Sequence, residues 1–533
     1  MYADRLLNDR VAPARGTLAT NTFQMLLLAV LATCVPVFAH AAGGIAVGLP
    51  FAVGLALLIA GGAPAAMPVA IVFAFMFQNA AVALISPLIT DQQSFNLARS
   101  YNFIIVATFW GVVLLNYFFG RTRLDRMTGL VFRYSLVVIG LIGVYLVIGA
   151  AQNANGAIIY LRNIAMPLMC LQIGLMVGAR YRPEIVPAVT IIAVAAVLYG
   201  LAELIFGVRF LHLVNGDSYF LLVQQDQHDS GFWVREMKET GYVLRDLADP
   251  KPAILFNYFK DIPIKFHRLL GPNYHPVSFT YAICFFVILL IAARRGLIYL
   301  LFAVPVLIAA GSKGALVYMA MTVAALFVAR RYRGPLLFPA FVLALAVYAV
   351  VAFSMALKQE NYHALGFLGG ITQFMANPFG HGLGAGGNLV TQIQDVDWSQ
   401  AQQTGKTDEA VESAIAVLLY QMGIAAFAYI AFLGWLSWRC WLEFRRTARP
   451  LLAAAAFGVL ALTVNGIFQE EAMFAPLALS LMTLLAGLEL GQAAKIGAPP
   501  SNSNGARTGP RRPRLEARPG PPRLQLAASS SGS

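Results

Sequence analysis

Nine ionisable side chains that lie within or beside apolar stretches of this sequence are our candidates for function, because charge is costly there. Arginine offers phosphate oxygens a planar, permanently charged fork, and lysine offers a point charge. A carboxylate can accept a proton from a sugar hydroxyl. Cations of this kind supply the chemistry that a polyprenyl pyrophosphate would need, and a carboxylate could act as the base for its acceptor. The nine residues are Arg162, Lys265, His267, Arg268, Lys313, His381, Glu412, Glu470 and Glu471.

Three cationic or titratable residues, Lys265, His267 and Arg268, precede an apolar stretch that begins near Val277. Basic side chains commonly anchor helix ends at the membrane interface. The alternative is a binding site for an anionic lipid-linked substrate, with Arg268 as its main cation. Position alone leaves both interpretations open. For His267 and His275, position indicates only a role in packing or in the orientation of Arg268.

Lys313 lies in a short polar break, Ala310-Gly-Ser-Lys-Gly-Ala315, between two apolar stretches. The glycines there allow backbone N–H groups to approach an anion. A second pyrophosphate contact and a generic turn are both compatible with this pattern.

A glycine-rich stretch, Asn377-Pro-Phe-Gly-His-Gly-Leu-Gly-Ala-Gly-Gly-Asn388, follows no predicted strand and lacks the Lys-Ser/Thr pair of a nucleotide-binding loop. We interpret it as a flexible turn that brings backbone close to a ligand, with His381 as an ordinary loop residue. Glu412 then begins an apolar helix. It is expected either to cap that helix, where a carboxylate is favoured, or to act as general base. Glu470 and Glu471 compete for the second role.

The composition excludes a soluble globular domain. Of the 533 residues, 59% are hydrophobic and only 12% are charged. The formal charge of +13 fits basic cytoplasmic loops better than nucleic-acid binding. The four cysteines form no CxxC pair and have no histidine beside them, so neither a disulfide framework nor a metal site is expected. We predict an all-α polytopic membrane protein without a cofactor.

A membrane-spanning helix needs roughly 20 apolar residues, and about 14 segments of this sequence approach that length. Their approximate limits are 22 to 41, 44 to 61, 65 to 87, 101 to 119, 130 to 150, 161 to 178, 185 to 206, 273 to 293, 296 to 311, 314 to 330, 335 to 355, 412 to 437, 451 to 468 and 472 to 490. The segment at 44 to 61 and the pair that meets at Gly311 to Gly314 are the least regular.

An even number of crossings places both termini on the same side of the membrane. With a cytoplasmic N-terminus, the short loops that contain Arg121, Arg180, Arg294, Arg330 and Arg445 all obey the positive-inside rule. Two long loops, 207 to 272 and 356 to 411, then lie on the opposite side, where chemistry is expected. The first includes an amphipathic stretch around Trp233. We predict a membrane domain over residues 1 to 491 and a disordered, basic cytoplasmic tail over residues 492 to 533.

Taken together, these features resemble the O-antigen polymerase and O-antigen ligase superfamily of bacterial envelope glycosyltransferases. Arg268-Leu-Leu-Gly271 with His275-Pro276 resembles the family's Arg-x-x-Gly…Pro segment. The turn at Gly311 to Ala315 is similar to its Gly-Ser-Arg-Gly-Ala motif, with Lys313 where arginine is usual. The glycine-rich loop and the helix from Glu412 to Gly423 resemble its Gly-x-Gly-x-Gly loop and His-Asn…Gly helix.

The resemblance implies a GT-C-type membrane fold in the inner membrane, with a periplasmic site that needs neither metal nor nucleotide sugar. It implies pyrophosphate binding by Arg268 and Lys313, with Arg162 and Lys265 as further candidates. Ligases typically have histidine where this chain has Glu412, which favours a polymerase of O-antigen, capsule or exopolysaccharide.

The expected partners are an undecaprenyl-pyrophosphate-linked oligosaccharide, membrane lipid, and a chain-length regulator with export machinery. A ligase that transfers glycan to lipid A core and a lipid-linked sugar flippase are the alternatives. Against the flippase, no internal repeat pairs the two halves of the sequence.

Overall fold

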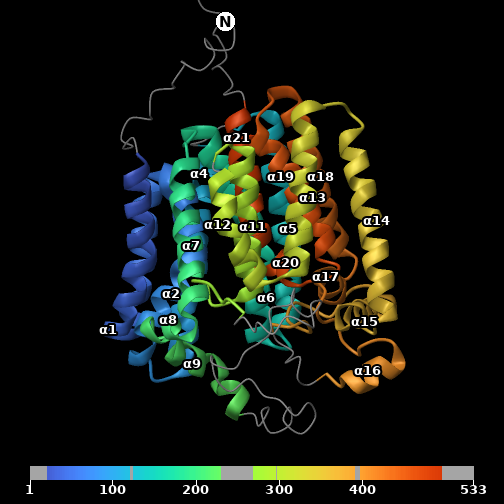
Figure 1. The fold of residues 1–533 in the computed structure, drawn as a ribbon, viewed down its shortest axis with the longest axis horizontal. Coiled ribbons are helices and arrows are strands. Elements are labelled where there is room, and N and C mark those ends of the chain that lie inside the picture. Colours follow the sequence, from blue (N-terminus) through green and yellow to red (C-terminus); the bar gives the residue numbers. More distant parts are fainter. Residues whose placement is uncertain (1–20, 121–123, 230–267, 296, 390–395, 495–533) are drawn as a thin grey trace, which may run out of the picture. The chain divides into compact units, whose positions relative to one another are not determined.

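The computed structural model describes residues 21–120, 124–229, 268–295, 297–389 and 396–494. All regular structure in these ranges is helical (Figure 1). The first half contains α1 (Thr22–Gly62), η2 (Pro64–Ala66), α2 (Met67–Ile85), η3 (Ser86–Leu88), α3 (Gln92–Arg99), α4 (Tyr101–Phe118), α5 (Arg126–Ala150), α6 (Ala154–Tyr181), α7 (Val186–Phe206), α8 (Val208–Leu213) and α9 (Gly216–Asp229).

The second half contains α11 (Pro276–Ala292), α12 (Leu297–Ala310), α13 (Lys313–Arg331), α14 (Leu337–Lys358), α15 (Tyr362–Ala376), α16 (Trp398–Thr404), α17 (Ala414–Met422), α18 (Ala425–Thr447), α19 (Pro450–Asn465), α20 (Glu471–Phe474), η6 (Pro476–Ser480) and α21 (Leu481–Ala493). Each of the 14 predicted apolar segments overlaps at least one of these helices.

Nine helices in the described residues are long and apolar enough to cross a membrane, judged by length and composition. They are Thr22–Gly62, Pro64–Leu88, Tyr101–Phe118, Arg126–Ala150, Ala154–Tyr181, Val186–Phe206, Lys313–Arg331, Leu337–Lys358 and Pro476–Ala493. Three shorter apolar helices, Pro276–Ala292, Ile298–Ala310 and Pro450–Asn465, lie among them. The chain is therefore a polytopic helical membrane protein.

Helix α1 consists of two arms. Its backbone is non-helical at Gly43 and Gly44, where φ is −150° and +61°. A Cβ atom placed on Gly48 would lie 3.0 Å from Cβ of His40, although eight residues of continuous helix would separate them by roughly 12 Å. The chain therefore folds back at the glycine pair, and the arms correspond to the predicted segments 22 to 41 and 44 to 61. By contrast, the predicted segment 412 to 437 is divided at Gly423 into α17 and α18.

The core of the bundle is the close crossing of α6 and α21. Both helices carry a small-xxx-small pair, Gly174 and Gly178 on α6 and Gly487 and Gly491 on α21. A Cβ atom on any of the four glycines would lie within 2.5 Å of backbone on the other helix. Glycine thus allows the two backbones to pack directly, as is common between helices in membranes. The cysteines Cys34, Cys170, Cys284 and Cys440 are all free.

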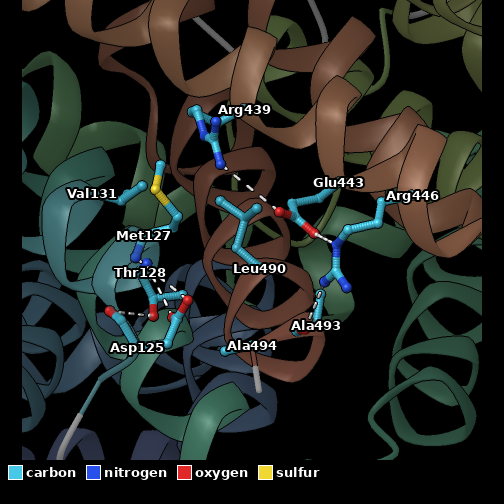
Figure 2. A pocket seen from close by; sticks show the side chains of 10 residues that line it. All are labelled: Asp125, Met127, Thr128, Val131, Arg439, Glu443, Arg446, Leu490, Ala493 and Ala494. Atoms are coloured by element: carbon cyan, nitrogen blue, oxygen red, sulfur yellow. Dashed lines mark hydrogen bonds and ion pairs between the residues drawn. The ribbon is translucent and has the colours of Figure 1, made fainter. Parts of the chain in front are cut away.

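The arginine-rich loops gather at one end of the bundle. Arg445 donates to the backbone oxygen of Arg333, and Arg182 and Arg446 donate to the carbonyls of Ala494 and Ala493. Figure 2 shows Glu443 between two arginines of α18, with N–O distances of 2.7 Å to Arg446 and 3.8 Å to Arg439.

Across a small cavity from these ion pairs, the Asp125 carboxylate accepts hydrogen bonds from Met127 and Thr128 and so begins α5. This basic end distinguishes one end of the bundle from the other. Helix α6 runs from the opposite end to Arg182, a rise of about 40 Å at 1.5 Å per residue.

Candidate functional site

A chain of hydrogen bonds at the end opposite the arginine loops connects Glu470 with Glu412. Glu470 is 2% exposed, and its carboxylate accepts from the Tyr160 hydroxyl at 2.6 Å and from the Asn388 N–H at 2.9 Å. The Asn388 side chain in turn accepts from the Glu412 N–H at 2.8 Å. The end of the glycine-rich loop thus links the two carboxylates through one asparagine.

Glu412 does not cap α17, so the capping interpretation of the sequence is wrong. The cap is Ser413, whose hydroxyl accepts from the Ala416 N–H. Glu412 has a φ of +64°, a left-handed conformation that non-glycine residues seldom adopt. This backbone directs its carboxylate to His363 of α15, at 2.9 Å from Nδ1. The histidine was not predicted, because it lies 49 positions earlier on a separate helix and no local pattern connects the two.

Burial and the neighbouring charges shift the protonation of this group of residues. Burial raises the pKa of Glu470 to about 8, despite the two hydrogen bonds that favour its ionised form. Burial also raises the pKa of Glu471, and the charge of Glu412 adds to the effect, whereas those of His363 and Arg268 oppose it. Burial disfavours the charged form of His363, but its pairing with Glu412 outweighs this and raises its pKa. His363 therefore stays protonated beside the Glu412 carboxylate up to a higher pH than a free histidine would.

Arg268 is positioned by a buried carboxylate that sequence reasoning missed. Glu203, at the end of α7, is fully buried and accepts from the backbone N–H groups of Leu270 at 2.7 Å and Gly271 at 2.9 Å. Gly271 has a φ of +68°, and a Cβ atom there would lie 2.4 Å from the ring of Phe279. The glycine of the Arg-x-x-Gly motif is therefore required for both conformation and space.

The guanidinium of Arg268 contacts the turn that precedes Lys313. Its Nε donates to the Ala310 carbonyl at 3.1 Å, and an Nη donates to the Gly311 carbonyl at 3.3 Å. Burial lowers the pKa of Arg268, and the charge of Glu471 opposes that shift. The two motifs predicted to bind pyrophosphate thus meet in the fold. Lys313 is exposed at the start of α13.

A cavity of about 450 Å³ opens beside these residues. Arg99, Arg162 and His275 line it together with Glu470 and Glu471. Much of the remaining wall is polar, from Asn79, Asn96, Asn102, Asn163, Asn273 and Asn388. The cavity is large enough and polar enough for a charged, hydroxyl-rich group, and Arg268 lies close enough to it to act electrostatically on His275.

His381 lies away from this cavity. It stacks on Tyr420 and lines a separate cavity of about 270 Å³ with Gln152 and Asn153. The glycines of its loop approach protein backbone instead of a ligand: Cβ atoms on Gly382 and Gly384 would lie within 2.6 Å of the chain around Gly149 and Gly156. The expectation of a ligand-approaching loop is therefore wrong for these two glycines. Lys265, His267 and the stretch around Trp233 lie outside the described residues.

Within the described ranges, no three His, Cys, Asp or Glu side chains are grouped as metal ligands. Comparison of the chain with protein-family models, curated proteins and solved structures finds no significant match.

Proposed function

We propose that this protein is a polysaccharide polymerase. It joins undecaprenyl-pyrophosphate-linked oligosaccharide repeat units on the periplasmic face of a bacterial inner membrane, and the product is an O-antigen, capsule or exopolysaccharide. In this proposal the chain crosses the membrane about 14 times in a GT-C-like arrangement, with both termini in the cytoplasm.

One observation carries the proposal: Arg268, Glu471, Glu412 and His363 form one electrostatically connected group beside a polar cavity. The group lies at the end of the bundle opposite the arginine loops, which is the periplasmic end if the positive-inside rule applies. A transfer from a lipid pyrophosphate to a sugar hydroxyl needs cations at the leaving group and a base at the acceptor. The two kinds of side chain occur here together.

In the proposed reaction Glu412 removes the proton from the acceptor hydroxyl. The acceptor oxygen forms a bond to the anomeric carbon of the donor sugar, and the bond from that carbon to the pyrophosphate oxygen breaks with inversion. The lipid pyrophosphate leaves with the electron pair. Arg268 stabilises the developing negative charge, with Lys313 and Arg162, and with Lys265 as a further candidate. His363 is a positioning residue that holds the Glu412 carboxylate.

A second candidate is an O-antigen ligase that transfers the glycan to lipid A core. The resemblance implies that ligases have a histidine where this chain has Glu412. Here His363 brings an imidazole to the Glu412 carboxylate from another helix, and this contact favours the ligase. Both candidates use the same donor, and they differ only in the acceptor.

Replacement of Arg268 tests the donor site. Arg268→Ala should abolish polymer in cells while the protein remains in the membrane. Arg268→Lys should restore little, because a lysine cannot donate from a fork to both the Ala310 and Gly311 carbonyls and a phosphate. Polymer is measured by gel analysis of extracted polysaccharide, with Arg209→Gln, an exposed arginine of α8, as the matched control. Normal polymer in the alanine variant would refute the role of Arg268.

A further inference from the structure

Two arginines that are distant from each other in the sequence line the cavity of about 450 Å³. Arg99 is the last residue of α3, and Arg162 lies near the start of α6. The Arg99 guanidinium is held over the rings of Phe95 and Tyr219, at 5.3 Å and 5.7 Å from their centroids. Arg162 experiences the repulsion of the Arg99 charge. Within the described residues, neither arginine forms an ion pair with a carboxylate.

Glu470 and Glu471 line the same cavity, but among the described residues neither carboxylate forms an ion pair with Arg99 or Arg162, so the repulsion between the two neighbouring cations has a free-energy cost that no direct ion pair offsets. The fold maintains this arrangement through the aromatic contacts of Arg99 and the tight packing of α6. The cost is removed when an anion enters the cavity. The arrangement therefore favours a ligand with negative charge.

His275 adds a neutral hydrogen-bond donor to the same wall. Its Nδ1 accepts from the Ser278 N–H at 3.2 Å, as the cap of α11, so the remaining proton of the neutral ring lies on Nε2. Burial, together with the charges of Arg268 and Arg99, lowers the pKa of His275 to about 4. Dense protein surrounds this residue, yet its ring is accessible because it faces the cavity. A neutral imidazole N–H is therefore available there at physiological pH.

Asparagine side chains form another part of the cavity wall. Asn273 is 5% exposed, and its Oδ1 is buried with no hydrogen-bond partner among the described residues. Asn79 donates to the Asn273 carbonyl at 2.8 Å and so fixes this segment beside α2. The asparagines of this wall offer amide donors and acceptors that can bond hydroxyl groups. The cavity thus suits a ligand that combines an anion with hydroxyl groups.

We propose that this cavity binds a glycosyl phosphate group, with phosphoryl oxygens on Arg99, Arg162 and the Nε2–H of His275, and sugar hydroxyls along the asparagine wall. The identification of this group as the sugar-bearing end of the lipid-linked donor rests on the proposed function. Arg268, whose donors already bond to Ala310 and Gly311, then acts at the reacting centre while Arg99 and Arg162 hold the anion.

The test is equilibrium binding of two radiolabelled probes, inorganic pyrophosphate and farnesyl pyrophosphate, to the purified full-length protein in detergent. Arg99→Gln and Arg162→Gln should each weaken binding about tenfold or more, because each removes charge-assisted hydrogen bonds. Arg209→Gln should bind as the wild type does. Unchanged affinity in both cavity variants, with an unchanged unfolding midpoint, would overturn the proposal.

Two variants of His275 test the role of its donor. His275→Asn retains a capping acceptor but cannot reach the Nε2 position, whereas His275→Gln carries an amide N–H close to that position. We expect the glutamine variant to bind more tightly than the asparagine variant. Equal affinities of the two variants would remove His275 from the binding site.

The two probes distinguish the source of the anion. Tighter binding of farnesyl pyrophosphate supports a lipid-linked ligand, and equal binding of the two probes overturns that assignment. The outcomes also separate the two proposals. If the wild type binds the probes but never lengthens a glycan, the proposed function fails and the anion site stands. If Arg99→Gln lengthens glycans and binds the probes normally, the anion site fails and the proposed function stands.

Discussion

At the scale of residues, the site depends on side chains that are distant in sequence and have complementary charge. The sequence identified Glu412, Glu470, Glu471, Arg162 and Arg268 as candidates because charge near an apolar segment is costly. It could not pair them, since pairing depends on the tertiary fold. Two partners were missed for this reason: His363, which contacts Glu412, and Glu203, which holds the Arg268 segment. A buried carboxylate inside an otherwise apolar α7 was the only available signal for Glu203.

The raised pKa of Glu470 predicts a pH dependence of stability. Its ordinary value is 4.5, and in the fold it lies at about 8. As the pH rises through this window, the unfolded chain releases the proton while the folded protein retains it, so the free energy of unfolding falls and then levels above pH 8. Glu470→Gln, which cannot ionise, should remove this part of the decline.

The measurement is the thermal unfolding midpoint of both proteins in detergent from pH 5 to pH 9. The wild-type midpoint should fall relative to that of the variant as pH rises. Parallel curves over the whole range would show that Glu470 does not retain its proton in the fold.

At the scale of elements, the candidate side chains lie where helices end. Arg268 precedes α11, Lys313 begins α13, Glu412 precedes α17, and Glu470 and Glu471 lie at the start of α20. Apolar segment length predicted the helices well, because it reflects a local property. It did not predict the division at Gly423 or the packing of the glycine-rich loop against the turn between α5 and α6, because both depend on contacts with distant backbone.

Two glycines allow this positioning to be tested at the level of one element. Gly271 and Gly405 share a positive φ, +68° and +75°, but an added Cβ meets the Phe279 ring at Gly271 and has open space at Gly405. Left-handed strain costs about 1–2 kcal/mol at either position, and the clash at Gly271 adds about 1–3 kcal/mol.

Gly271→Ala should therefore lower the unfolding midpoint more than Gly405→Ala does. It should also displace Arg268 and reduce activity. Thermal unfolding and polymer yield measure the two effects. Equal destabilisation by the two variants would mean that the Arg268 segment does not need its close contact with α11.

At the scale of the whole molecule, the two ends of the bundle differ in charge. Arginine loops gather at one end, and the carboxylates and the polar cavity lie at the other. The positive-inside rule then predicts the orientation in the membrane. Reporter fusions after Arg333 and Arg449 should be cytoplasmic. Fusions after Asp229 and Gln400 should be periplasmic, measured by alkaline phosphatase and fluorescent-protein activity. A cytoplasmic reporter after Gln400 would place the site on the wrong side for a periplasmic polymerase.

In the proposed function, this end of the bundle joins lipid-linked glycans, with Glu412 as the base. The most direct test incubates the purified full-length protein with undecaprenyl-pyrophosphate-linked repeat units and measures chain length. The wild type and Glu360→Gln, an exposed carboxylate at the same end, should lengthen the chains. Glu412→Gln should be slower by about 10²–10⁴-fold, the usual contribution of a general base. Chains that lengthen equally with Glu412→Gln would contradict the assignment of the base, and a wild type that leaves every repeat unit unjoined would contradict the proposed function itself.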